Sequence, residues 1–209
     1  MKILIINGKG FSGKDTFVDY LEKYAKVNRY STIDNIKDIA KKYFDWNGEK
    51  DLKGRKLLSD LKIASIEYNN KPHEDMIKAI EDARNKKYDL FTCMIRDIPE
   101  IEKACNDDRI KKDIITIMIT SDRTKNNTYG NVGDDNVYNY HYNYYIDNSG
   151  TLDDLRDAVD LFVADIGLKN NTTKQLCSQL KKEIDEFMNI KHIKERGLRI
   201  KALNRKNNR

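Results

Sequence analysis

A glycine-rich segment near the amino terminus has the residue types and spacing of a phosphate-binding loop. Residues 8–14 read Gly-Lys-Gly-Phe-Ser-Gly-Lys and fit the pattern G-x-x-x-x-G-K. Glycines let the backbone wrap around a phosphate, successive N–H groups and the start of a following helix donate to the anion, and the lysine adds a positive charge. We expect nucleotide phosphates to be bound by Gly8, Lys9, Gly10, Phe11, Ser12, Gly13, Lys14, Asp15 and Thr16.

The residue after Lys14 departs from the commonest form of this loop, in which a serine or threonine hydroxyl faces Mg²⁺. Asp15 takes that place here, and Thr16 follows it. Phosphates repel an acidic side chain unless that side chain points away from them. We therefore expect Thr16 to supply the hydroxyl that faces the metal.

The segments on either side of the loop have the patterns that would position it. Residues 3–6 form a continuous apolar run, which is typical of a strand buried on both faces. After the loop, Phe17, Leu21 and Tyr24 recur at helical spacing. The sequence therefore predicts a strand, a phosphate loop and a helix in that order.

Further strands and helices alternate along the chain. The predicted strands cover residues 30–33, 90–95, 114–120 and 143–147, and the predicted helices cover 35–44, a stretch from about 51, stretches from about 72 and 99, and 152–166. This alternation favours an α/β fold of three layers, in which helices flank a parallel sheet of about five strands. The run of tyrosines at 138–145 leads into the last strand; its rings either pack on one face, or one of them lies against a nucleotide base.

Two segments fall outside this alternation. Residues 122–137 have no periodicity and carry two glycines and four asparagines, which predicts a long loop that acts as a lid. Residues 169–209 carry 12 Lys and Arg against four Asp and Glu, and they predict a basic helical extension of a domain that covers residues 1–168. The extension has an apolar stripe, whose expected partner is either that domain or a second subunit, as in a homodimer; its positive face would contact nucleic acid weakly.

Composition excludes several classes of protein. The chain has 209 residues, of which 39% are hydrophobic and 35% charged, enough for one globular domain with a heavily solvated surface. No stretch approaches the ~20 apolar residues that cross a bilayer, and residues 3–6 are too few for a signal-peptide core. The three cysteines are widely spaced, without the pairs of a disulfide framework or zinc site. We expect reduced thiols, a cytoplasmic location and no contact with a membrane.

Four segments together resemble one family. Residues 12–16 read S-G-K-D-T and resemble the loop of phage and bacterial deoxynucleoside monophosphate kinases, and the displaced threonine of a G-K-x-T ending is also found in nucleoside monophosphate kinases. Residues 50–58 resemble the K-D-x-x-x-R-x-L-L segment of that group, residues 95–101 its R-x-p-x-E-I segment, and residues 147–155 its last strand-to-helix connection. The resemblance implies a P-loop NTPase fold, ATP and Mg²⁺ as cofactors, and a nucleoside monophosphate, in particular a deoxynucleoside monophosphate, as the acceptor.

An acceptor phosphate needs its own cations opposite the ATP loop, and ligands of parallel sheets bind at the carboxyl ends of strands. Lys50 and Arg55 begin one predicted helix and Arg96 follows a central strand, so these three are the candidate clamp. Asp34 and Lys37 follow the second strand and would face the same crevice, although Asp34 could instead cap its helix.

Two more side chains complete the predicted site. Glu100 would orient Arg96 or bind a ribose hydroxyl, and Arg123, at the start of the lid, would close over the transferred phosphate. We expect Lys14, Arg96 and Arg123 to be the catalytic residues. Relatives often carry an aspartate shortly before the strand-three arginine, where Cys93, Met94 and Ile95 stand here, so Asp34, Asp97 and Asp122 all remain candidates for the acidic partner of Mg²⁺.

Two other functions remain open from the sequence. One is a kinase of a hydroxyl acceptor, such as dephospho-coenzyme A or a nucleoside, which needs a general base and for which Asp34 is the candidate. The other is a non-catalytic nucleotide-binding module that associates with nucleic acid through the basic extension, although Phe187 is the extension's only aromatic residue, which does not indicate base stacking.

Overall fold

Five parallel strands form the centre of the molecule. The computed structural model describes residues 1–49, 51–126 and 136–168. The sheet has the strand order β2-β3-β1-β4-β5, and every neighbouring pair is parallel. The strands are β1 (Lys2–Asn7), β2 (Val27–Tyr30), β3 (Leu90–Met94), β4 (Ile114–Thr120) and β5 (Tyr144–Asp147). The apolar run at residues 3–6 therefore forms the middle of the central strand, where both faces are covered.

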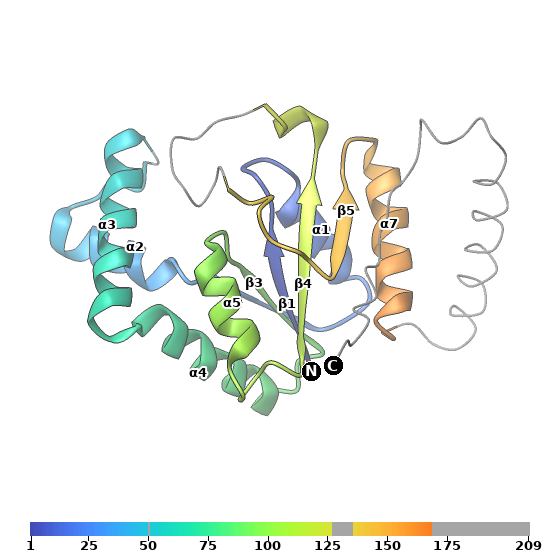
Figure 1. Cartoon of the computed structure of the whole chain (residues 1–209), viewed down its shortest axis with the longest axis horizontal. Coiled ribbons are helices and arrows are strands. Elements are labelled where there is room, and N and C mark those ends of the chain that lie inside the picture. The colour runs from blue at the N-terminus through green and yellow to red at the C-terminus, as the bar shows by residue number, and fades with distance from the viewer. Residues whose placement is uncertain (50, 127–135, 169–209) are drawn as a thin grey trace, which may run out of the picture.

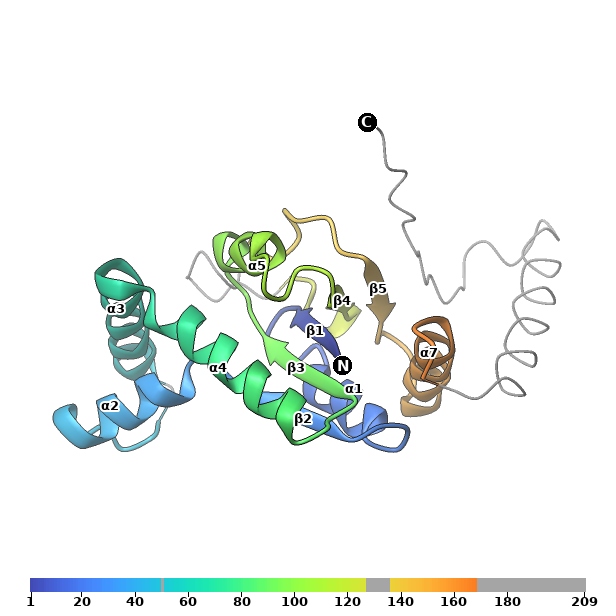
Figure 2. The ribbon, with the colours of Figure 1, turned by 90° about the horizontal axis from the view of Figure 1, so that it is seen from below.

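Helices cover both faces of this sheet. On one face lie α1 (Lys14–Leu21) and α7 (Leu152–Asp165), and on the other lie α4 (Lys71–Asn85) and α5 (Ile98–Asn106). Figure 2 shows the sheet edge-on between these two pairs. An apolar core lies on each face of the sheet, and alternate residues of β1 pack into the two cores. Ile3 and Ile5 pack with α4 and α5, while Leu4 and Ile6 pack with α1 and α7. The predicted α/β class and its three layers around a five-stranded parallel sheet are confirmed.

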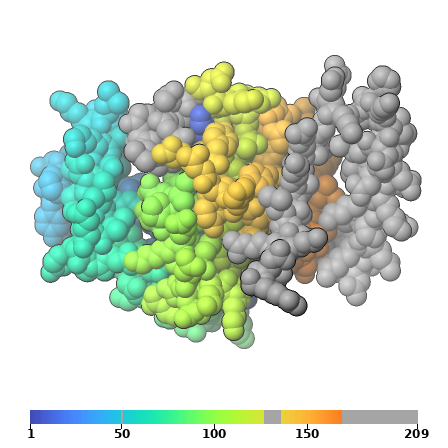
Figure 3. All heavy atoms as spheres, viewed as in Figure 1, coloured from blue at the N-terminus to red at the C-terminus, as the bar shows by residue number. Residues whose placement is uncertain are grey.

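A pair of helices lies beside the sheet. The helices α2 (Asp34–Phe44) and α3 (Leu52–Asn69) share a small apolar cluster that includes Ile36, Ala40 and Leu58. Figure 1 places them at one side of the molecule, and Figure 3 shows them as a lobe next to α5. Because α3 begins at the end toward which the strands point, its first turn lies on the same side of the molecule as the phosphate loop (Figure 1).

One strand was placed wrongly from the sequence. The prediction put the second strand at residues 30–33, whereas the structure has Val27–Tyr30 paired in register with Leu90–Cys93. The chain turns after Tyr30, since the backbone N–H of Asp34 donates to the carbonyl of Ser31 at 3.3 Å and α2 begins there. The helix after the loop ends at Leu21, before Tyr24, although helical spacing predicted that Tyr24 belonged to it. The remaining predicted elements agree with the structure to within about two residues, the usual uncertainty of element ends.

Two predicted segments fall largely outside the described residues. These are the lid, of which residues 127–135 are not described, and the basic extension at 169–209. Within the described residues, no helix has the length and apolar character needed to cross a membrane.

Candidate functional site

The phosphate loop lies between β1 and α1, at the carboxyl end of the central strand (Figure 1). Two of its glycines are required by close approach. A Cβ on Gly8 would lie 2.4 Å from the carbonyl oxygen of Ile119, and one on Gly13 would lie 2.1 Å from Nδ2 of Asn148. Both glycines also have positive φ, 145° and 94°, which side chains rarely tolerate. Any larger residue at either position would deform the loop.

Lys14 is folded over the loop that precedes it. Its Nζ donates to the carbonyl oxygens of Gly8 and Lys9, at 2.7 Å each, and the residue is only 6% exposed. These two contacts hold the ammonium group across the mouth of the loop. The positive charge of Lys14 is therefore held next to the backbone of the loop.

The remaining loop residues fit a phosphate ligand. The N-cap residue of α1, which starts at Lys14, is Gly13, which has no side chain with which to cap the helix. The hydroxyl of Ser12 is buried and has no hydrogen-bond partner among the described residues, so it is a donor that a ligand could use. Asp15 is exposed while Thr16 is half-buried, as expected if the acid points away from the phosphates. The loop thus offers backbone donors, a cation and hydroxyls for an anion, and Thr16 could hold Mg²⁺.

Arg96 follows β3, the neighbour of β1, and its backbone is hydrogen-bonded to the last residue of β1. The Nδ2 of Asn7 donates to the carbonyl oxygen of Arg96 at 3.2 Å. In the β1–β3 register Ile6 pairs with Met94, so the two strands end side by side. The structure therefore brings the backbone of Arg96 next to the phosphate loop, as the parallel-sheet argument predicted.

The other predicted clamp residues lie at the start of α3. Asp51 caps the helix by accepting a 2.7 Å hydrogen bond from the backbone N–H of Gly54, and Arg55 follows as an exposed side chain in the first turn. Lys50 lies outside the described residues. Arg55 thus projects from the first turn of a helix that begins at the same end of the molecule as the phosphate loop (Figure 1).

Asp34 and Lys37 pair with each other. The Lys37 Nζ and Asp34 Oδ1 are 2.6 Å apart at the start of α2. Asp34 is the first residue inside the helix, and Ile33 occupies the N-cap position without a side-chain cap bond. The alternative in which Asp34 caps the helix is therefore wrong: its carboxylate binds a lysine one turn later.

Glu100 pairs with Lys62, a residue that the sequence analysis did not identify. The Nζ of Lys62 lies 2.6 Å from Oε1 of Glu100 and 3.4 Å from Oδ2 of Asp97, and its side chain is only 14% exposed. Burial raises the pKa of the Glu100 carboxyl above its usual range, although the Lys62 charge acts in the opposite direction. This lysine joins α3 to the first turn of α5, directly after Arg96. The signal in the sequence was its position four residues after Leu58, on the inward stripe of α3.

Arg123 lies in a short 3₁₀ helix (Asp122–Thr124) after β4, and it binds the connection between β5 and α7. Its guanidinium donates to the carbonyl oxygens of Asn148 at 2.6 Å and Gly150 at 3.4 Å. Asn148 in turn donates from Nδ2 to the carbonyl of Ser12 at 2.9 Å. A chain of contacts therefore links Arg123 to the phosphate loop, and Asn148 is a second residue whose role the sequence did not indicate.

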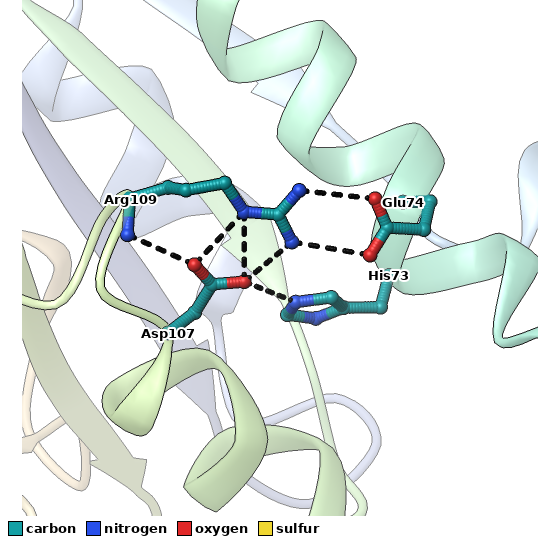
Figure 4. A network of polar contacts seen from close by, with 4 residues as sticks. All are labelled: His73, Glu74, Asp107 and Arg109. Atoms are coloured by element: carbon teal, nitrogen blue, oxygen red, sulfur yellow. Dashed lines mark hydrogen bonds and ion pairs between the residues drawn. The ribbon is translucent and has the colours of Figure 1, made fainter.

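Figure 4 shows a separate polar network of four residues, which lies at the opposite end of the strands from the phosphate loop. Arg109 contacts Glu74 through both terminal nitrogens, at 3.1 Å each, and Asp107 at 2.6 Å, while Nε2 of His73 lies 2.9 Å from Asp107. Asp107 and Arg109 connect α5 to β4, and that connection lies at the amino ends of the strands because β3 and β4 are parallel. The network joins α4 to the segment between α5 and β4, and it is not part of the phosphate site.

The sequence matches no protein-family model and no curated protein. Among solved structures, the chain is similar to a sugar kinase from Janibacter sp. HTCC2649, with a TM-score of 0.45 and 9% identity over 80% of this chain and 96% of that one. It is also similar to TT1252 from Thermus thermophilus, with a TM-score of 0.41 and 15% identity over 78% of this chain and 97% of that one. Both similarities are distant.

Proposed function

We propose that this chain is an ATP-dependent phosphotransferase whose acceptor is a nucleoside monophosphate, in particular a deoxynucleoside monophosphate. The observation that carries the proposal is the phosphate loop between β1 and α1 with Lys14 held across it, and with Arg96 following the adjacent strand. The phosphates of the donor ATP and the acceptor phosphate would thus meet at the carboxyl ends of β1 and β3. The choice of a deoxynucleotide rests on the resemblance of residues 12–16, 50–58, 95–101 and 147–155 to deoxynucleoside monophosphate kinases.

In this mechanism the protein contributes mostly position and charge. The loop N–H groups and Lys14 would bind the phosphates of ATP, and Arg55 and Arg96 would hold the acceptor phosphate in line with the γ-phosphate. Mg²⁺, held with the help of Thr16, would neutralise charge on the β- and γ-phosphates. Arg123 would add a positive charge to the transferring group when the lid closes and excludes water.

The candidate cations favour a phosphate acceptor over a hydroxyl acceptor. Transfer to a hydroxyl needs a general base, for which the candidate is Asp34, whose Oδ1 lies 2.6 Å from the Nζ of Lys37. An acceptor phosphate is already anionic and needs no base, only cations. The arginines at positions 55 and 96 suit that requirement.

The test is a panel of acceptors supplied to the purified full-length chain with Mg²⁺ and ATP. Ribo- and deoxynucleoside monophosphates, nucleosides and dephospho-coenzyme A are compared by ADP release, with the phosphorylated product identified by mass spectrometry. We expect diphosphate products from one or more deoxynucleoside monophosphates and no product from the hydroxyl acceptors. Product from a hydroxyl acceptor alone would support the alternative kinase, and ATP binding without any product would support a non-catalytic module.

A further inference from the structure

Three segments that are distant in the sequence meet at one buried side chain, that of Asn7. Asn7 is the last residue of β1 and is fully buried. Its Oδ1 accepts a 2.7 Å hydrogen bond from the backbone N–H of Gly8, and its Nδ2 donates to the carbonyl of Arg96 at 3.2 Å and to the hydroxyl of Tyr142 at 2.7 Å. An asparagine side chain has two N–H donors and one carbonyl acceptor, and Asn7 uses both donors and the acceptor.

Tyr142 fixes the orientation of that amide. Its hydroxyl carries one hydrogen, which it donates to the carbonyl of Val137 at 2.8 Å, so toward Asn7 it can only accept. Nδ2 of Asn7 must therefore face the tyrosine, and Oδ1 faces Gly8. Tyr142 is only 2% exposed, and its ring packs edge-on against the rings of Tyr140 and Tyr145. Burial also raises the pKa of the Tyr142 hydroxyl, which keeps it neutral.

The contacts join parts of the chain that are distant in sequence. Asn7 is 89 residues from Arg96 and 135 residues from Tyr142. Val137 is the last residue of the predicted lid. The pair therefore connects the first residue of the phosphate loop, the backbone of the predicted acceptor-binding arginine and the backbone of Val137.

We propose that Asn7 and Tyr142 are positioning residues that hold Arg96 in register with the phosphate loop. This inference rests on the proposed function for its kinetic consequence, but the positioning itself does not depend on the reaction. An aliphatic residue at position 7 would fill the same space without these contacts. A core residue whose only role is packing would not need two donors and an acceptor aimed at three separate segments.

The decisive variant is Tyr142→Phe, which removes one hydroxyl and keeps the ring. It leaves one donor of the Asn7 amide without a partner, which loosens the amide and its contact with Arg96, while the Gly8 contact from Oδ1 can persist. We expect the acceptor KM to rise about tenfold while the ATP KM changes less than about twofold. Asn7→Leu removes all three contacts and should raise both KM values.

Tyr145→Phe is the matched control. The hydroxyl of Tyr145 accepts from the backbone N–H of Tyr142 at 3.2 Å and donates to the carbonyl of Tyr140 at 3.4 Å, in the same ring cluster but without reaching Asn7. We expect it to lower the melting temperature comparably and to leave both KM values unchanged. In the double variant Asn7→Leu/Tyr142→Phe, the acceptor KM should match that of Asn7→Leu alone, because Tyr142 acts through Asn7.

A second measurement is independent of phosphoryl transfer. Amide hydrogen exchange in Tyr142→Phe should become faster in residues 95–101 and 136–142 and remain unchanged in β4, whereas Tyr145→Phe should leave residues 95–101 as in the wild type. If the wild type phosphorylates no nucleoside monophosphate, the proposed function fails and this exchange pattern alone decides the positioning role. Unchanged exchange at 95–101 in Tyr142→Phe, or equal KM changes in the two tyrosine variants, would overturn the inference.

Discussion

The side-chain amide of Asn148 donates a 2.9 Å hydrogen bond to the carbonyl of Ser12, and so supports the phosphate loop from the end of β5. The same amide occupies the space that a Cβ on Gly13 would need. Asn148 is only 6% exposed, and its own backbone N–H donates to the carbonyl of Thr120 at 2.8 Å. The loop is thus supported by Asn148, which is itself held to the end of β4.

We expect Asn148→Ala to weaken ATP binding. The variant leaves the Ser12 carbonyl without its partner, which costs about 1–3 kcal/mol for a buried polar group. We expect the loosened loop to raise the ATP KM by roughly 5- to 150-fold, the range to which this free energy corresponds. Asn143→Ala is the control, because Asn143 bonds Thr116 through its side chain at the beginning of β5, away from the loop. An unchanged ATP KM in Asn148→Ala would show that the loop does not need this support.

Lys14→Ala should nearly abolish phosphoryl transfer while the fold persists. The variant removes the positive charge at the mouth of the loop, and losing one such electrostatic contact typically costs about 10²–10³ in rate. Turnover is measured by ADP release and the fold by circular dichroism and thermal unfolding. Lys23→Ala, which removes an exposed lysine just after α1, should behave as the wild type. Wild-type turnover in Lys14→Ala would remove the basis of the proposed function.

Arg55→Ala should mainly raise the acceptor KM, because the exposed side chain would contact the acceptor phosphate both before and during transfer. The neighbouring Lys56→Ala serves as the control, since Lys56 is also exposed and forms an ion pair with Asp60 at 2.7 Å within the same helix. Steady-state kinetics with varied acceptor and saturating ATP separates the two variants. Identical KM values for Arg55→Ala and Lys56→Ala would exclude Arg55 from the clamp.

Arg123→Ala should mainly lower kcat, because its contact with the transferring phosphate would form only when the lid closes. In the structure its guanidinium donates to the carbonyls of Asn148 and Gly150, and we expect it to exchange these contacts for the phosphate during transfer. Arg156→Ala is the control, because this arginine pairs with Asp153 at 3.1 Å within α7. A raised ATP KM with unchanged kcat would instead mean that Arg123 acts only by supporting Asn148.

Asp107→Asn should destabilise the fold in a pH-dependent way. The hydrogen bond from Arg109, with that from His73, lowers the pKa of Asp107 well below its usual range. The ionised carboxylate therefore contributes stability above the unfolded pKa of about 3.9, and this contribution is lost as the pH falls through the folded pKa. We expect the variant to lower the free energy of unfolding by about 2 kcal/mol at pH 7, with the difference shrinking below about pH 4.

The control for that prediction is Asp108→Asn. Asp108 is 87% exposed and pairs only locally with Lys111, three residues later. Denaturant unfolding of both variants at several pH values checks the forecast. A constant difference between Asp107→Asn and the wild type from pH 7 to pH 3 would contradict it.

The local patterns of the sequence were enough to predict the fold class and most of its elements. Three patterns predicted elements from residues that are close together in the sequence: the apolar run at 3–6, the helical spacing after Lys14 and the β-branched run at 114–120. Each pattern indicates which side chains are buried and does not depend on the rest of the chain. The phosphate loop is equally local, because glycine spacing and one lysine set its shape. The second strand was misplaced because Val27–Tyr30 is short and only partly buried, and its limits depend on pairing with β3.

The tertiary structure alone decided which side chains from distant segments meet. Asn148 contacts Ser12 across 136 residues, Asn7 contacts Tyr142 across 135, and Lys62 pairs with Glu100 from another helix. None of these pairs has a sequence spacing that reports the contact, since each depends on the order of strands in the sheet and on how α3 packs beside it. Hydrogen bonds and ion pairs act over a few ångströms of space, whereas periodicity reports only neighbours along the chain, and for that reason the supports of the site emerged only once the chain was folded.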